Sequence, residues 1–213
     1  MEQDIAILIA DLSGYTALTE THGALSAADL IDKYIEIVNN SLIGDSHLHE
    51  RVGDEVMIIA DSPDNLLLTA AVLSRNILKE YNFLQIHGAL HYGKILKRNN
   101  SFFGSAINLT SRIASQAKPG IFLCSEDFVN TLTDKNTYSF KSMGKYNFKN
   151  VSEKKEVFEV ITDNPDNIHI DPICRMLLNS EEQLLLHPTE ANIFFCSRHC
   201  LNIYVNVKTN SKK

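Results

Sequence analysis

The sequence predicts an α+β fold, with a sheet on one side and helices on the other. Apolar runs of strand length, helical stretches with one apolar face and hairpins follow one another along most of the chain. The helices do not alternate strictly with single strands, so a purely parallel sheet is not expected. A polar segment with a proline, residues 163–168, then separates these elements from a short part that carries three of the four cysteines.

The first elements bring two aspartates toward one edge of the predicted sheet. Residues 5–10 are an isoleucine-rich run typical of a buried strand, and Asp11 stands where this run stops. Residues 48–60 are predicted to form a hairpin that turns at Gly53 and Asp54. If the two strands pair, both carboxylates emerge together, where they suit a hard divalent cation such as Mg²⁺. Either aspartate alone is more typical of a turn residue or a helix cap.

Three helices and several short strands complete this part of the chain. A capping-box pattern at residues 26–29 opens a helix after a polar helical entry, residues 62–63 suit the start of a second, and a third is predicted over residues 104–116. Further strands are predicted over residues 83–95 (strand, turn and strand), 121–124, 138–140 and 157–160. His87 and His91 alternate along the first of these segments and are interpreted as solvated or hydrogen-bonded strand residues rather than catalytic ones.

Length and charge limit the classes of function. The 213 residues suffice for one well-packed domain and a small appendage. The 26 acidic residues against 20 basic ones give a net charge of −6 without a long basic run, which argues against nucleic acid or an anionic membrane as partner. The first apolar run is too short to span a bilayer and follows no basic residue, so we expect neither a signal peptide nor an anchor, and a cytoplasmic protein.

The third predicted helix carries Asn108 and Arg112, which are four residues apart and therefore share one helix face. Together with three other segments, this helix resembles the catalytic domain of class III nucleotide cyclases, the adenylate and guanylate cyclases. The resemblance implies a ferredoxin-like cyclase domain over residues 1–162. The segments that carry it are residues 11–16, 53–54, 104–112 and 144–160.

The resemblance implies an enzyme that converts a nucleoside triphosphate to its 3′,5′-cyclic monophosphate and pyrophosphate. Asp11 and Asp54 would hold two Mg²⁺ or Mn²⁺ ions per site, which would lower the pKa of the attacking 3′-hydroxyl. Asn108 would orient the ribose, and Arg112 would stabilise charge on the α-phosphate. Lys149 would reach a terminal phosphate. The backbone N–H groups that would cradle the β and γ phosphates belong to Leu12, Ser13, Gly14, Tyr15 and Thr16.

In this family the metal-binding aspartates and the Asn–Arg pair of one site come from different subunits. A chain with both sets therefore implies a homodimer with two equivalent sites. The alternative is a degenerate cyclase fold that holds nucleotide without turnover and signals through a partner, under control of a metal in its C-terminal part. The presence of all four groups, Asp11, Asp54, Asn108 and Arg112, favours the enzyme.

Two positions concern the choice of base. ATP-specific members of the family commonly carry Lys four residues before the second metal aspartate, where this chain has Glu50. They commonly carry Asp or Thr three residues before the helix glycine, where this chain has Ser101. An ionised Glu accepts hydrogen bonds from guanine N1 and N2, and a Ser hydroxyl can donate to O6. The expected substrate is therefore GTP in preference to ATP, unless Glu50 pairs with Arg51 or a lysine.

Residues 169–206, hereafter the C-terminal module, resemble a YHS domain, a small TRASH-like metal-binding unit, with Arg175 where many members have Gly. Its three thiolates suit Zn²⁺ or another soft metal, and a polar tail at residues 207–213 follows it. The predicted metal ligands are Cys174, Cys196 and Cys200. The candidates for a fourth ligand are His199, His187 and Asp171.

Overall fold

A computed structural model of the chain describes residues 2–99, 101–135, 137–162, 168–178 and 184–210. These residues form two compact units. The first unit comprises Met1–Asp11, Val38–Ser74 and Ile86–Asp163. The second comprises Leu12–Ile37, Arg75–Gln85 and Asn164–Lys213. Most of the linker expected at residues 163–168 lies outside the described residues, as do the last three residues of the expected tail.

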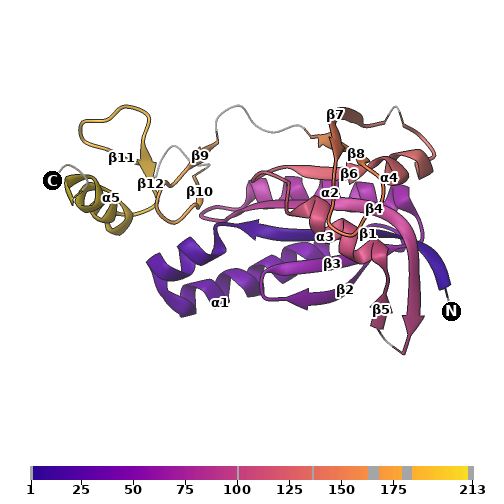
Figure 1. The fold of residues 1–213 in the computed structure, drawn as a ribbon. Coiled ribbons are helices and arrows are strands. Elements are labelled where there is room, and N and C mark those ends of the chain that lie inside the picture. The colour runs from indigo at the N-terminus through magenta and orange to yellow at the C-terminus, as the bar shows by residue number, and fades with distance from the viewer. Residues whose placement is uncertain (1, 100, 136, 163–167, 179–183, 211–213) are drawn as a thin grey trace. The chain divides into compact units, whose positions relative to one another are not determined.

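The first unit is built on an eight-stranded mixed sheet (Figure 1) in the order β2-β3-β1-β4-β6-β8-β7, with β5 paired to β4. Strands β4 and β6 are parallel, whereas β1 and β3 pair antiparallel, with Ile9 opposite Met57. This mixture of hairpins and a parallel pair confirms the α+β prediction. The strands are β1 (Glu2–Ser13), β2 (His47–Val52), β3 (Glu55–Ala60), β4 (Gln85–Arg98), β5 (Ser101–Phe103), β6 (Phe122–Ser125), β7 (Ser139–Tyr146) and β8 (Lys155–Ile161).

Strand β1 is buried on both faces along its apolar run. Ile5, Ile7 and Ile9 belong to a core cluster that also contains apolar residues of helix α3 (Ser105–Ala114). The residues between these isoleucines, Ala6 and Leu8, are fully buried as well. A continuous apolar run is typical of a strand covered on both faces, and this explains why residues 5–10 do not alternate with polar residues.

Strand β4 differs from the prediction. Residues 83–95 were expected to turn and return, but Gln85–Arg98 is one continuous strand. Gly88 lies inside it because a Cβ at this position would come within 2.4 Å of the Ile9 carbonyl oxygen. The glycine therefore permits close approach of two backbones rather than a turn.

The helices begin at recognisable caps. Helix α2 (Pro63–Lys79) starts after Ser62, whose hydroxyl accepts a hydrogen bond from the Asn65 amide at 3.3 Å. Helix α4 (Glu126–Thr131), which the sequence analysis did not predict, is capped in the same way by Ser125. Helix α1 (Tyr15–Ser41) consists of two helical stretches joined at Gly23, whose φ of 85° and ψ of 167° are not helical.

The C-terminal module lies in the second unit with part of α1 and with residues 75–85. Its backbone is joined to the latter segment because the Leu177 amide donates to the Phe83 carbonyl at 2.6 Å. No helix in the described ranges is both long and apolar enough to span a membrane. The elements of the module are β9 (His169–Ile170), β10 (Leu177–Leu178), β11 (Leu185–Leu186), β12 (Phe194–Phe195) and α5 (Arg198–Asn210), the last of which extends into the expected tail.

Candidate functional site

The two predicted metal aspartates lie together in the first unit. Asp11 follows the buried run of β1, and Asp54 occupies the turn between β2 and β3, where Gly53 has a φ of 64°. The pairing of β1 with β3 places Ala10 opposite Val56, so the two aspartates flank the same end of the pair. Burial, the hydrogen bond that protonated Asp54 donates to the Asp11 carboxylate and the charge of Asp11 raise the pKa of Asp54 to about 6. Two carboxyl groups this close favour a bound proton or a divalent cation.

His87 on β4 is a neighbour of this pair. Its ring hydrogen-bonds to the backbone of Asp11 and faces the charge of Asp54, while burial lowers its pKa. His91, four residues further along β4, is buried with its Nδ1 2.7 Å from the Ser125 hydroxyl, and burial lowers its pKa to about 4. Both side chains are thus neutral, hydrogen-bonded strand histidines near neutral pH, as the sequence indicated.

A second group of predicted residues gathers at a separate cavity of about 190 Å³ in the same unit. Glu50 from β2 and Asn108 from α3 both line it. Its apolar walls are Ile9, Val52, Met57 and Ile107. Asp11 and Asp54 are not among its lining residues. Close sequence neighbours of the two aspartates, Ile9, Val52 and Glu55, do line it.

Arg112 follows Asn108 by one helical turn on α3, and its Nη1 donates a hydrogen bond to the carbonyl oxygen of Lys149. The structure thus brings Arg112 beside the residue that was expected to reach a terminal phosphate. Ser101 is exposed in the short strand β5, where it pairs with Arg98. It is not among the residues that line the cavity of Glu50 and Asn108.

The predicted phosphate-binding turn, residues 12–16, belongs to the second unit. Gly14 has a φ of 97°, and its carbonyl oxygen accepts a hydrogen bond from the Leu18 amide at 3.0 Å. Helix α1 therefore begins immediately after Gly14. The first amide groups of any helix lack partners within that helix and attract anions.

The three predicted cysteine ligands converge within the second unit, and His22 of α1 joins them. The four ligand atoms all lie within 4.8 Å of one another. The Cys174 thiol donates a hydrogen bond that lowers the pKa of Cys196. The Cys196 sulfur is therefore the one that most readily becomes a thiolate. Sequence reasoning missed His22 because 151 residues separate it from Cys174 and no motif spacing links them.

The three fourth-ligand candidates from the sequence do not join this cluster. Asp171 is fully buried, and its carboxylate accepts hydrogen bonds from the amides of Ile173, Cys174 and Cys196. His187 accepts hydrogen bonds from the Thr189 and Glu190 amides at Nδ1. His199 is exposed, with its ring centroid 6.3 Å from that of His22.

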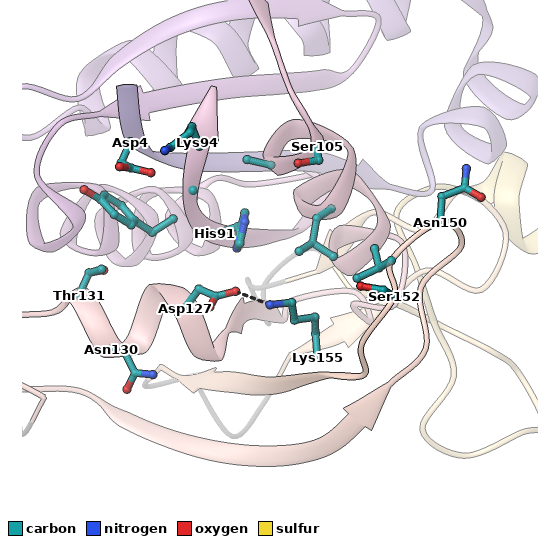
Figure 2. Close-up of a pocket in the computed structure, with 15 residues that line it drawn as sticks. Asp4, His91, Lys94, Ser105, Asp127, Asn130, Thr131, Asn150, Ser152 and Lys155 are labelled. Carbon is teal, nitrogen blue, oxygen red and sulfur yellow. Dashed lines mark hydrogen bonds and ion pairs between the residues drawn. The ribbon is translucent and has the colours of Figure 1, made fainter. Parts of the chain in front are cut away.

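A larger cavity of about 590 Å³ lies elsewhere in the first unit, between β4, α3, α4 and residues 150–155. Figure 2 shows Asp127 and Lys155 joined there, with Lys155 Nζ 3.2 Å from Asp127 Oδ2. His91 and Lys94 point into it from β4. None of the predicted metal- or nucleotide-binding residues lines this cavity, so it is separate from the site predicted from the sequence.

We predict that Asp54→Asn stabilises the metal-free protein at about pH 8. The pKa of Asp54 is raised from 3.8 to about 6, so protonation favours the folded state and this stability is lost as the pH rises through about 6. Removing the charge should raise the free energy of unfolding by about 1 kcal/mol at about pH 8, after allowance for solvent screening of a half-buried group. Thermal melts with a chelator should show little difference between the wild type and Asp54→Asn at about pH 4. Asp54 of the folded wild type is then protonated and neutral, like the asparagine.

The exposed Asp61→Asn variant is the charge-matched control and should leave the melting temperature nearly unchanged. Added Mn²⁺ should raise the melting temperature of the wild type but not that of Asp54→Asn. A substituted protein that is less stable than the wild type at about pH 8 would contradict repulsion between the two carboxylates.

Known proteins resemble this chain in sequence and in fold. No family model matches the chain. An adenylate cyclase from Glutamicibacter nicotianae is 32% identical over 131 residues, which are 60% of this chain and 32% of that protein. The chain spans about a third of the length of the curated relatives it matches.

Two solved structures illustrate the shared fold. An adenylate cyclase from Trypanosoma brucei, in its monomeric state, superposes with a TM-score of 0.69 at 16% identity, over 90% of this chain and 95% of that one. The guanylate cyclase domain of RhGC from Catenaria anguillulae, in complex with GTP, superposes with a TM-score of 0.64 at 16% identity, over 77% of this chain and all of that one. The α+β fold of this chain is therefore that of adenylate and guanylate cyclase domains.

Proposed function

We propose that the chain is a class III nucleotide cyclase that acts as a homodimer with two shared sites. The observation that carries the proposal is the presence of two groups of side chains on one chain. Asp11 and Asp54 form a pair of neighbouring carboxyl groups, and Asn108 and Arg112 follow one another on α3, with Asn108 at the cavity of Glu50. Each set is half of a cyclase site, so two copies in head-to-tail contact would complete two sites.

Asp11 and Asp54 would hold the catalytic ions, and their paired carboxylate oxygens suit Mg²⁺ or Mn²⁺. Two such ions, when bound, would lower the pKa of the ribose 3′-hydroxyl and neutralise the triphosphate. The ring of His87 orders the Asp11 backbone from the neighbouring strand. The start of α1 after Gly14 would direct backbone N–H groups at the β and γ phosphates.

The other half-site would position the reacting groups. Asn108, at the cavity beside Glu50, would orient the ribose of a nucleotide whose phosphates are held by the partner copy. Arg112 would place its guanidinium against the α-phosphate as negative charge grows there. Its hydrogen bond to the Lys149 carbonyl restricts the guanidinium and leaves the Lys149 ammonium nearby for a terminal phosphate.

The C-terminal module would bind a soft metal such as Zn²⁺ through Cys174, Cys196 and Cys200. The cysteines of the described residues are free thiols, which suits a reducing compartment such as the cytoplasm.

A protein of this fold that binds nucleotide without turnover is the second candidate. The first is favoured because all four groups needed for chemistry are present and arranged in two complementary sets.

We predict that Asp54→Ala and Arg112→Ala are each inactive alone but complement each other when mixed. A heterodimer of the two would contain one intact site, so an equal mixture should recover about a quarter of wild-type turnover. Mixing Asp54→Ala with Asp11→Ala is the matched control, because both changes affect the same half-site and no intact site can form. Cyclase rates of the three mixtures, with dimers verified by native mass spectrometry, test this. Equal rates in the test and control mixtures would refute shared sites.

We further propose that the substrate is GTP in preference to ATP. Glu50 lines the cavity with Asn108, Glu55, Ser111 and four apolar residues, and its side chain is exposed in the single chain. A carboxylate in such a place matches the N1 and N2 donors of guanine, whereas adenine would leave it without a donor at that edge. Ser101 would complete the contact with guanine O6 if β5 lies closer to the cavity when nucleotide is bound.

We predict that kcat/KM favours GTP over ATP by about tenfold or more in the wild type. A bound base would cover the exposed Glu50 carboxylate, and leaving it without a donor there would cost about 1–3 kcal/mol. The double substitution Glu50→Lys with Ser101→Asp should shift the ratio toward ATP by a similar factor. Arg51→Lys, next to Glu50 in the exposed part of β2, is the control and should leave the ratio unchanged. A wild type that prefers ATP, or a double variant with an unchanged ratio, would overturn the assignment.

A further inference from the structure

His22 faces the three cysteines of the C-terminal module from helix α1. Its Nε2 atom lies 3.6 Å from the Cys196 sulfur and 3.6 Å from the Cys200 sulfur. The Cys196 sulfur in turn lies 3.6 Å from that of Cys174 and 3.5 Å from that of Cys200. A tetrahedral zinc site with Zn–S bonds of about 2.3 Å has ligand–ligand edges of about 3.8 Å. The four atoms are thus already spaced nearly as such a site requires.

The scaffold holds each cysteine in place independently of any metal. Cys174 lies in a turn whose amides donate to the buried Asp171 carboxylate, and the Cys196 amide donates to the other oxygen of the same group at 2.8 Å. Cys200 lies in the first turn of α5, where its amide donates to the Ser197 hydroxyl. Asp171 therefore acts as a positioning residue that links two ligand-bearing segments.

An ordinary buried cysteine cluster is a poorer explanation. Apolar packing accounts for part of the burial, since Cys174 and Cys200 pack with Phe195, but it does not require ligand atoms to converge. Here a ring nitrogen and three sulfurs converge, and the two cysteine sulfurs nearest His22 have its Nε2 as a common neighbour. Soft sulfur ligands with one imidazole are the ligand set of structural zinc sites of the Cys₃His type.

We propose that His22 is the fourth ligand of a Cys₃His site for Zn²⁺ or a similar soft divalent metal. The metal thereby fastens the C-terminal module to the first helical stretch of α1. This stretch ends at Gly23, directly after the ligand, so the metal fixes its far end. His22 lies outside the cysteine motif, and any effect of this metal on catalysis rests on the proposed function.

A second contact joins the module to the near end of the same stretch. A Cβ on Gly14 would come within 2.4 Å of the Arg175 Cβ, so the Arg175 side chain packs directly against Gly14. Arg175 follows the ligand Cys174 and has a φ of 68°, a conformation that a non-glycine residue adopts at a cost. The metal-binding turn therefore packs against the proposed phosphate-binding turn. Loss of the metal should make residues 12–22 less ordered.

The test is metal binding by the full-length protein, which requires no cyclase activity. Wild type loaded with Zn²⁺ should retain about one ion per chain after gel filtration, and His22→Ala should weaken binding by about tenfold or more. His22→Cys supplies another soft ligand and should restore binding. His199→Ala is the matched control, since this exposed neighbour should not affect it. In the Co²⁺-loaded protein, His22→Cys should shift the thiolate-to-metal absorption, because a fourth sulfur has replaced nitrogen.

Hydrogen exchange then tests the coupling to the catalytic half-site. Removing the metal with a chelator should speed amide exchange in residues 12–22 of the wild type, and His22→Ala should show the fast exchange even with metal present. Unchanged affinity and Co²⁺ spectra in both His22 variants would overturn the ligand assignment. If metal binding depends on His22 but amide exchange in residues 12–22 does not change on metal removal, the proposed coupling between the metal and this stretch of α1 would be overturned. Neither outcome depends on whether the protein makes a cyclic nucleotide.

Discussion

The structure depends first on the antiparallel pairing of β1 with β3, which holds two carboxylates side by side against their mutual repulsion. Burial and the neighbouring Asp11 both raise the pKa of Asp54, so ionising it costs free energy in the folded chain. The buried isoleucines of β1 pack against α3 and hold the strand in place. A cation held by both carboxylates, as proposed above, would offset the cost of their like charges.

The proposed division into two half-sites would explain why a single chain carries the groups of a cyclase site and still needs a second copy. Asn108 and Glu50 share one cavity, and the aspartate pair lies outside it. Dimerisation would therefore be part of the chemistry rather than a means of added stability. The C-terminal module contacts the turn at Gly14, the proposed phosphate-binding turn, through Arg175. A metal that holds this module in place would then adjust how well the turn binds phosphate.

Much of this could be predicted from the sequence because the signals are local. The continuous apolar run of residues 5–10 and the Ser62 cap each depend on a few neighbouring residues, and both appear in the structure. The errors come from contacts between distant segments. A turn was expected within residues 83–95, but β4 is continuous there and Gly88 serves its approach to β1. His22 has no motif of its own, because its role arises only when α1 meets the cysteines. Likewise, no local pattern shows that Asp171 is occupied by backbone amides rather than free to bind metal.

The central claim, that this chain forms a working cyclase from two copies, is tested most directly by product analysis. Purified protein is incubated with Mn²⁺ and either GTP or ATP, and the nucleotides are separated and identified by mass spectrometry. The account predicts a 3′,5′-cyclic nucleotide and pyrophosphate in equal amounts, none when a chelator is present, and a specific activity that rises with protein concentration as dimers form. Verified dimers that bind nucleotide and yield no cyclic product from either triphosphate would contradict it.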